Sequence, residues 1–288
     1  MTKPKTKSQL LRQRRMYLII ILTIIFSIAV LLMVNAIINA LKDEPIVIDY
    51  EYTTPDDLLD LPLSIIDPEY LEGDMFKTYD TDEYTSSLGI DVSSHQSSID
   101  WEMVSDAGIE FVYIRVGYRG YQSGLLNLDT MFYEHYEGAK AAGLEVGVYF
   151  FSQAISAEEA IEEAYFVYSI IKDLDIDLEV VYDLEEISDD VSRIVDVSAE
   201  VRTECAIAFA SKIEELGFSS MIYTNLFWTI HYYDLMQIMN YPIWYAQYSD
   251  APDLPYYFRL WQYTDSGVVF GIEELVDINI RIEDKWCT

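Results

Sequence analysis

The sequence is poor in the residues that build metal and phosphate sites. Its 288 residues include three His and two Cys, and His95, His135 and His231 lack the spacing of metal ligands. It has no glycine-rich phosphate loop and no Gly-x-Ser-x-Gly nucleophile elbow. We therefore expect no metal ion and no bound cofactor. The scarcity of histidine also argues against a polysaccharide deacetylase, which needs a His-rich metal site.

Basic residues are scarce as well, and they are concentrated at one end. Six of the 18 Lys and Arg residues lie in the first 15 positions, whereas all 50 Asp and Glu residues follow residue 42. The formal net charge is −32. Because nucleic-acid binding requires basic patches that neutralise phosphates, we expect no nucleic-acid partner.

Residues 16–41 contain no charge and consist mainly of Ile, Leu, Val, Phe and Ala. About 20 apolar residues are enough to span a bilayer, so we predict a transmembrane helix here. Basic residues flank only its N-terminal side, which places residues 1–15 in the cytoplasm and the remainder outside. A cleaved signal peptide ending near Val34-Asn35-Ala36 is the alternative, although the apolar run is longer than such peptides usually have.

Residues 42–86 are acidic, are interrupted by proline and keep neither a helical nor a strand period. We interpret them as a stalk that is partly packed on the following domain and, as a coil, spans roughly 35–40 Å. The domain that follows is predicted over residues 87–288. Within it, Cys205 lies in a helical pattern and is expected to be a small buried hydrophobe, with a disulfide to Cys287 as the open alternative.

From Leu88 onward, short apolar runs alternate with helical stretches, which indicates βα units. The expected strands are Leu88–Val92, Phe111–Val116, Glu145–Phe151, Glu179–Asp183, Ser220–Thr224, Ile243–Gln247, Arg259–Tyr263 and Val276–Ile280. The expected helices are Trp101–Ala107, Thr130–Ala142, Ala157–Lys172 and Val197–Leu216, and helices fade after Asn225. This order predicts an α/β fold, a TIM-like barrel of eight strands with five helix-bearing crossovers; a doubly wound open sheet is the alternative.

The stretch Val180–Glu186 places Asp183 and Glu185 two residues apart at the end of an apolar strand. Alternate strand residues share a face, so both carboxyls would point the same way. Such a pair suits proton chemistry at a glycosidic bond, although solvated surface acids are the simpler interpretation. Other predicted strand ends carry Asp91, Arg115 and Asp277, together with aromatics and amides, and barrel active sites lie at these ends.

A series of motifs resembles glycoside hydrolase family 25, the lysozyme-like N-acetylmuramidases of the Chalaropsis type. The motifs follow the family's order over about Leu88–Ile280: Gly89-Ile90-Asp91-Val92-Ser93-Ser94-His95-Gln96, Ile99-Asp100-Trp101, Arg115-Val116-Gly117-Tyr118-Arg119-Gly120, Gly147-Val148-Tyr149-Phe150-Phe151-Ser152-Gln153-Ala154, Tyr182-Asp183-Leu184-Glu185, Ile243-Trp244-Tyr245-Ala246-Gln247-Tyr248, Leu260-Trp261-Gln262-Tyr263 and Val276-Asp277-Ile278-Asn279.

The resemblance implies a (β/α)5(β)3 barrel that cleaves the β-1,4 bond between N-acetylmuramic acid and N-acetylglucosamine. It assigns the catalytic acids to Asp91, Asp183 and Glu185 and adds Asp277 at the site floor. We expect Glu185 to be the general acid. Asp183 either acts as nucleophile or stabiliser, or orients the substrate's 2-acetamido group, and the resemblance favours the second.

Further residues are expected to contact the glycan of peptidoglycan. The sugar-binding candidates are Tyr149, Tyr223, Trp244, Gln262 and Arg115, the last of which is Lys in some family members. With the predicted helix, this suggests a single-pass enzyme on the outer face of a bacterial, Gram-positive cell membrane. A catalytically silent peptidoglycan-binding module and a cell-surface scaffold remain the alternatives.

Overall fold

The computed structural model describes residues 59–186 and 192–286, which lie in one compact unit, Leu59–Thr288. The predicted tail at residues 1–15, the anchor at residues 16–41 and the first part of the stalk lie outside the described residues. Across 59–186 and 192–286, no helix has the length and apolar character needed to cross a membrane.

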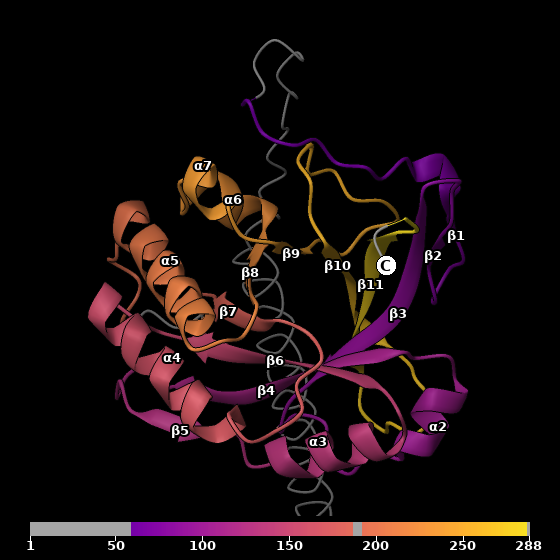
Figure 1. Ribbon diagram of the computed structural model, residues 1–288, viewed down its shortest axis with the longest axis horizontal. Helices are drawn as coiled ribbons and strands as arrows, with labels where there is room; N and C mark the ends of the chain where they lie inside the picture. Colours follow the sequence, from indigo (N-terminus) through magenta and orange to yellow (C-terminus); the bar gives the residue numbers. More distant parts are fainter. Residues whose placement is uncertain (1–58, 187–191, 287–288) are drawn as a thin grey trace, which may run out of the picture. The chain divides into compact units, whose positions relative to one another are not determined.

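The core of the unit is a closed β-barrel (Figure 1). Its strands are β3 (Tyr84–Val92), β4 (Phe111–Arg119), β6 (Glu145–Ser152), β7 (Val180–Leu184), β8 (Ser220–Asn225), β9 (Ile243–Ala246), β10 (Leu260–Gly267) and β11 (Val276–Asp284). β3 pairs with both β4 and β11, which joins the two ends of the sheet. This closure confirms the predicted barrel and excludes the open sheet. A short strand, β5 (Leu126–Leu128), extends the sheet beside β4.

Helices occupy the five crossovers between β3 and β9. They are α2 (Trp101–Asp106), α3 (Phe132–Ala141), α4 (Ala157–Ile171), α5 (Ala199–Glu215), α6 (Leu226–His231) and α7 (Leu235–Ile238). As expected for C-terminal cap positions, Gly108, Gly143 and Gly217 follow α2, α3 and α5 with positive φ. The sequence missed the short helices α6 and α7, because four to six residues are too few to establish a helical period.

The last strand runs against its neighbours. β11 is antiparallel to both β10 and β3, and Asp277 is the Cα partner of Asp91 in this pairing. The other barrel pairs are parallel. Asp277 is therefore near the beginning of its strand, not at its end as the sequence analysis placed it. The reversed direction of β11 nevertheless brings it to the edge where the other strands end.

The barrel interior is filled with aromatic and aliphatic side chains. One buried cluster in the interior includes Phe111, Tyr113, Val181, Met221 and Trp244. Two glycines make room for these rings. A Cβ at Gly89 would lie 2.2 Å from the Phe111 ring, and one at Gly147 would lie 2.3 Å from the Tyr113 ring. Only a residue without a side chain fits at these positions.

Residues 59–83 pack on the barrel beside β3 and β10. This segment contains a 3-10 turn, η2 (Pro68–Tyr70), and a small hairpin of β1 (Leu71–Glu72) and β2 (Thr78–Tyr79). Leu63 forms a β-bridge with Tyr256, and the Tyr263 hydroxyl donates to the Met75 carbonyl at 2.8 Å. The described part of the predicted 42–86 stalk thus belongs to the same compact unit as the barrel, and its predicted boundary at residue 87 falls inside β3.

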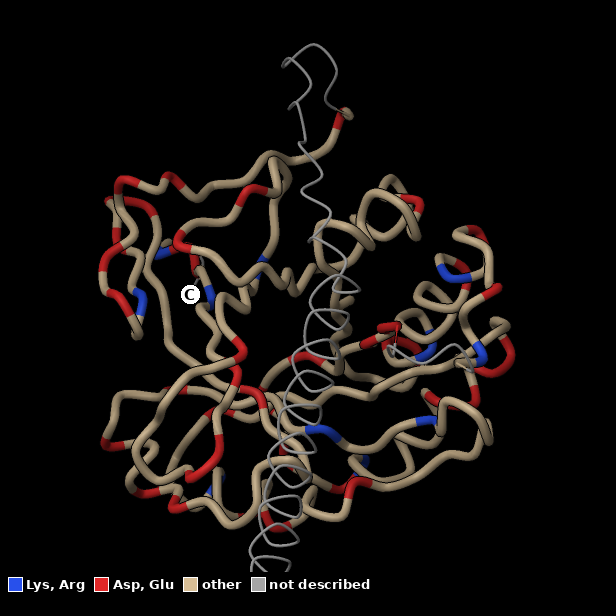
Figure 2. The backbone as a smooth tube through the Cα atoms, turned by 180° about the vertical axis from the view of Figure 1, so that it is seen from behind, with Lys and Arg blue, Asp and Glu red and all other residues tan. Residues whose placement is uncertain are grey.

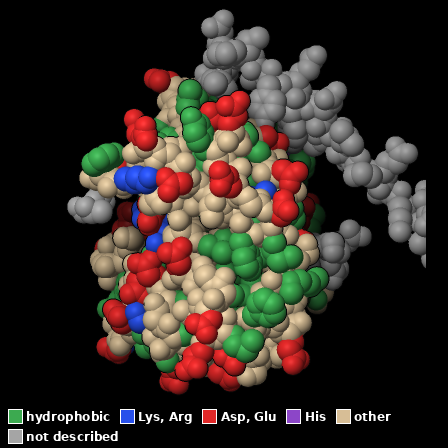
Figure 3. Space-filling view, turned by 90° about the vertical axis from the view of Figure 1, so that its right-hand side faces the viewer, with side chains coloured by type: hydrophobic (Ala, Val, Ile, Leu, Met, Phe, Trp, Pro, Cys, Tyr) green, Lys and Arg blue, Asp and Glu red, His purple; other side chains and the backbone are tan. Residues whose placement is uncertain are grey.

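Acidic residues are spread over the loops and helices of the unit, with few basic ones among them (Figure 2). On the face drawn in Figure 3, acidic side chains are scattered around the apolar ones, which form their largest group in the lower half of the view. Cys205 is a fully buried free thiol, as predicted, and burial raises the pKa of this thiol to about 12. Cys287 lies outside the described residues.

We expect Gly89→Ala to lower the free energy of unfolding by about 1–3 kcal/mol, because the added methyl group would overlap the Phe111 ring. Urea denaturation followed by tryptophan fluorescence measures this change. Ser87→Ala on the same strand is the control, since its buried hydroxyl has no hydrogen-bond partner among the described residues. That change should be close to neutral, and equal losses in the two variants would contradict the packing argument.

Candidate active site

A cavity of about 330 Å³ opens at the edge where the parallel barrel strands end. Its walls contain all nine of the side chains that were selected from the sequence. Each of the eight barrel strands contributes one, and the ninth belongs to the residue that follows β7. They are Asp91, Arg115, Tyr149, Asp183, Glu185, Tyr223, Trp244, Gln262 and Asp277.

Asp91 is held at the base of the cavity by two amide side chains. Its Oδ2 atom accepts hydrogen bonds from Gln262 Nε2 and Asn279 Nδ2, both at 2.8 Å. Asn279 is in turn oriented by Trp244, whose indole Nε1 donates to its Oδ1 at 2.8 Å. Burial raises the pKa of Asp91 to about 6, although both hydrogen bonds stabilise the carboxylate. Asp91 therefore has a fixed orientation and a reduced tendency to ionise.

Asp183 and Glu185 enter the cavity from β7 and from the residue that follows it. Asp183 is buried, and its Oδ1 has no hydrogen-bond partner among the described residues. Burial, followed by the charges of Glu185 and Asp91, raises the pKa of Asp183 well above its ordinary value. Burial also raises the pKa of Glu185 to about 7, although the nearby Tyr223 hydroxyl opposes this shift. A pKa near 7 leaves about half of the Glu185 carboxyls protonated at neutral pH.

Asp277 completes a group of four carboxyls. Burial and the charges of Asp91, Asp265 and Glu185 raise the pKa of Asp277 to about 9. Four like charges cannot all be ionised in a small desolvated space, so the group holds protons at neutral pH. A site of this kind can supply a proton to a leaving oxygen and stabilise positive charge that develops beside it.

Arg115 is the cation in the cavity wall, and its guanidinium is already engaged. Nε donates to Asp129 Oδ2 at 2.8 Å and Nη2 donates to Ser94 Oγ at 3.0 Å. The Ser94 amide donates to the same Asp129 oxygen. Arg115 therefore fixes the loop after β3, and its charge favours the ionised form of Asp183. These hydrogen bonds are all to protein groups, and the sugar contact expected for Arg115 stays a prediction.

The aromatic rings of the cavity differ in how well they are placed to contact a sugar. Trp244 is 1% exposed and contacts the rings of Tyr113, Tyr149 and Tyr223, so it forms the cavity floor. The Tyr223 hydroxyl donates to Gln262 Oε1 at 3.1 Å. Tyr248, which the sequence analysis did not select, donates to the same oxygen at 3.2 Å and is 54% exposed. An exposed ring at the cavity mouth is better placed than Trp244 to pack on a sugar.

Several further residues of the site were not predicted from the sequence. Those lining the cavity are Ser93, His95, Gln96, Phe151, Tyr248, Asp265 and Leu275. Asn279 supports Asp91 from below. Most of them lie within the motifs that carry the family resemblance, whereas Asp265 and Leu275 belong to the β10–β11 hairpin and had no sequence signal.

Metal ligands are not grouped in the part of the chain that the structure describes: no three His, Cys, Asp or Glu side chains there are arranged to hold an ion. His135 is fully buried, and its Nε2 lies 3.2 Å from the carbonyl oxygens of Ser93 and Gln96. It supports the loop after β3.

The sequence was also compared with models of known protein families. Residues 90–272 match the family described as Glycosyl hydrolases family 25. The chain belongs to this family. The match covers the barrel from β3 into the β10–β11 connection, and it begins one residue before Asp91.

A known protein is similar in sequence to part of this chain. The autolytic lysozyme of Clostridium acetobutylicum is 30% identical over 195 residues, which is 66% of this chain and 54% of the relative. The chain thus spans about half the length of that protein.

Solved structures show the same fold. The autolysin LytC from Streptococcus pneumoniae, in complex with a synthetic peptidoglycan ligand, has a TM-score of 0.60 at 22% identity, over 68% of this chain and 46% of its own. The spore cortex lytic enzyme SleM of Clostridium perfringens has a TM-score of 0.58 at 22% identity, over 68% and 67%. The catalytic domain of an endolysin from Listeria bacteriophage P40 has a TM-score of 0.55 at 25% identity, over 68% and 92%.

The raised pKa of Asp277 predicts a pH-dependent cost to stability. Between about pH 4 and 9 the folded state keeps a proton on Asp277 that the unfolded state releases. The free energy of unfolding should therefore fall as pH rises through this window. Asp277→Asn should remove part of this slope and stabilise the protein at pH 8 by on the order of 2 kcal/mol.

Urea denaturation at pH 5, 6.5 and 8 measures the slope for both proteins. Asp173→Asn is the control, since Asp173 is exposed and does not line the cavity. Parallel pH profiles for wild type and Asp277→Asn would contradict the raised pKa.

Proposed function

We propose that the protein is a peptidoglycan hydrolase that cleaves the β-1,4 bond between N-acetylmuramic acid and N-acetylglucosamine. The observation that carries this proposal is the group of four carboxyls in a cavity of a family 25 barrel, with Glu185 at a pKa of about 7. The relatives agree with it, since one is an autolytic lysozyme and another was solved with a peptidoglycan ligand.

Glu185 acts as the general acid. Its proton passes to the glycosidic oxygen as the bond from that oxygen to the anomeric carbon of N-acetylmuramic acid breaks, and N-acetylglucosamine leaves with a free hydroxyl. The remaining sugar carries positive charge at the anomeric carbon. The carboxylates of the cavity stabilise this charge, and the ionised Glu185 then removes a proton from the attacking water.

Asp183 orients the 2-acetamido group of the substrate in this mechanism. Its carboxylate accepts a hydrogen bond from the acetamido N–H, and the acetamido oxygen attacks the anomeric carbon to form a cyclic intermediate. Water opens this ring, so the configuration at the anomeric carbon is retained. The buried carboxyl oxygen of Asp183 without a protein partner supports this role, as does the positive charge of Arg115 beside it.

The enzyme is tethered to the outer face of the cytoplasmic membrane of a Gram-positive bacterium. The support is the charge-free run of residues 16–41 with basic residues on its N-terminal side alone. The compact unit begins at Leu59, so residues 42–58 lie between it and the predicted anchor in the sequence. The strongly acidic domain then works on the wall layer next to the membrane.

Glu185→Gln should lower the rate of reducing-end release from peptidoglycan by about 10²–10⁴-fold, because the amide cannot donate the required proton. Mass analysis of wild-type products should show N-acetylmuramic acid at the new reducing ends. Glu186→Gln is the matched control, since the side chain of Glu186 lies outside the cavity and 3.8 Å from Arg202.

Two results would refute the proposal. Unchanged cleavage by Glu185→Gln would remove Glu185 from the chemistry. Binding of peptidoglycan by the wild type without any new reducing ends would support the silent binding module instead.

Replacing residues 1–42 by a cleavable secretion signal should release an active enzyme into the medium, because the compact unit retains the whole cavity. Fractionation and zymography measure this outcome, with the full chain expected in the membrane fraction. Recovery of the full chain from the soluble fraction would contradict the anchor.

A further inference from the structure

Gln153 lies in the turn between β6 and α4, and both ends of its side-chain amide form hydrogen bonds. Its Nε2 donates to the backbone carbonyl oxygen of Glu185 at 2.9 Å. Its Oε1 accepts a hydrogen bond from Ser192 Oγ at 2.8 Å. The side chain is fully buried. A single amide therefore joins two points of the β7–α5 connection, which carries Glu185.

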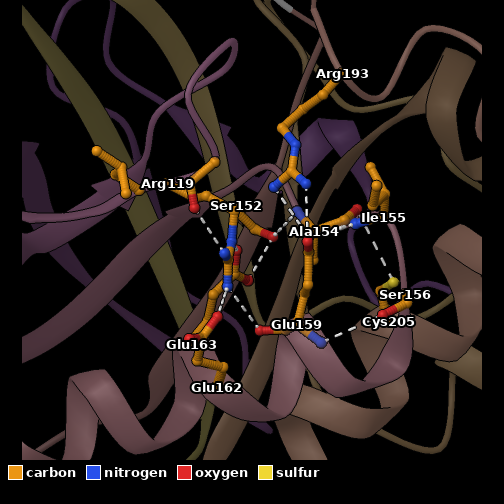
Figure 4. Close-up of polar contacts among 12 residues, drawn as sticks. Arg119, Ser152, Ala154, Ile155, Ser156, Glu159, Glu162, Glu163, Arg193 and Cys205 are labelled. Carbon is orange, nitrogen blue, oxygen red and sulfur yellow. Dashed lines mark hydrogen bonds and ion pairs between the residues drawn. The ribbon is translucent and has the colours of Figure 1, made fainter.

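The turn that presents Gln153 is itself fixed by a buried ion pair (Figure 4). Ser152 Oγ donates to Glu163 Oε2 at 2.7 Å and accepts from the Ala154 amide at 3.1 Å. Arg119 Nε donates to the other Glu163 oxygen at 2.7 Å, and both side chains are nearly inaccessible to solvent. Charged hydrogen bonds in a low-dielectric interior resist rearrangement, so Gln153 rests on a rigid support.

A second pair of contacts fixes the far end of the same connection. Arg193 donates to both carboxylate oxygens of Glu159, from Nη1 at 2.9 Å and from Nη2 at 2.8 Å. Glu159 also accepts the Ile155 amide at 3.2 Å (Figure 4). Arg193 follows Ser192 directly. The β6–α4 turn and the start of α4 thus hold the connection at Glu185, Ser192 and Arg193.

We propose that Gln153 is a positioning residue for the proton donor: its hydrogen bond to the Glu185 carbonyl sets the direction in which the Glu185 carboxyl enters the cavity. This inference rests on the proposed function for the role of Glu185. Glu185 follows the last residue of β7, where the strand ladder ends. A side-chain donor therefore takes over the orientation of this peptide where the sheet stops. Misplacement of a catalytic group by about 1 Å can cost 10²-fold in rate.

Loss of this bond has a consequence for pH as well as for rate. Burial keeps the Glu185 carboxyl protonated up to a pKa of about 7. A Glu185 that moves toward solvent regains hydration, so its pKa falls toward the ordinary value. Because the general acid must be protonated, the alkaline limb of the kcat/KM profile moves to lower pH.

The test compares Gln153→Met with Ser192→Ala. Methionine is similar in length to glutamine and removes both hydrogen bonds, whereas Ser192→Ala removes only the one to Ser192 and leaves the donor to Glu185. For Gln153→Met we expect kcat to fall about 10- to 100-fold with KM within about twofold and the alkaline limb to move down by about one pH unit. Ser192→Ala should stay within about threefold of wild type.

Circular dichroism establishes that each variant is folded. If Gln153→Met does not fold, Gln153→Leu tests the same bond, because leucine has no donor for the Glu185 carbonyl. A kcat within twofold of wild type and an unmoved alkaline limb would overturn the inference, as would an equal loss in Ser192→Ala.

Absence of cleavage by the wild type refutes the proposed function instead. The positioning role is then measured by carbon NMR of the Glu185 carboxyl, whose pKa should be lower in Gln153→Met than in wild type. An unchanged titration would overturn the inference independently of any activity.

Discussion

The pairing of β3 with both β4 and β11 is the constraint on which the site depends. This double pairing closes the sheet, and it places Asp91 next to Tyr113 on one side and Asp277 on the other. Closure gives the cavity walls on all sides, so water is limited and each carboxyl is desolvated. The raised pKa values of Asp91, Asp183, Glu185 and Asp277 all have burial as their largest cause. An open sheet would leave these groups hydrated and ionised at neutral pH.

Four carboxyls can share the cavity because a small number of polar contacts gives each of them a different environment. Asp91 receives two amide hydrogen bonds and can ionise, whereas Asp277 lies among other acids and keeps its proton at neutral pH. Each hydrogen bond to a charged group contributes roughly 1.5–3 kcal/mol, which is comparable to the cost of a pKa shift of one or two units. Neighbouring acids therefore take different protonation states, as acid–base catalysis requires.

The support of the site extends outward in layers. Trp244 and Asn279 hold Asp91 from inside the barrel, and Gln153 reaches Glu185 from outside it. Behind Gln153, the Arg119–Glu163 ion pair is sealed between β4 and α4. On the side of β10, β11 and β3, no helix of the described chain covers the sheet (Figure 1). The segment of residues 59–83 packs there and stabilises the barrel.

Much of the fold was predictable because it depends on local patterns. Each of the eight barrel strands was expected within a few residues of its observed range, since buried strands are apolar and are separated by helices with glycine caps. Residues 59–83 were harder to predict, because their order comes from contacts such as Leu63 with Tyr256 that lie far apart in the chain. The short helices α6 and α7 were not predicted, because four to six residues are too few to show a helical period.

The sequence by itself determined the candidate acids, because the motifs around Asp91, Asp183, Glu185 and Asp277 are contiguous and carry their own spacing. The tertiary structure alone decided how these residues are used. Asp277 reaches the site since β11 runs antiparallel, Trp244 becomes a floor since its ring is enclosed by three others, and Gln153 holds Glu185 from another crossover. Protonation states and orientations arise from burial and from partners distant in sequence, and neither can be read from one stretch of chain.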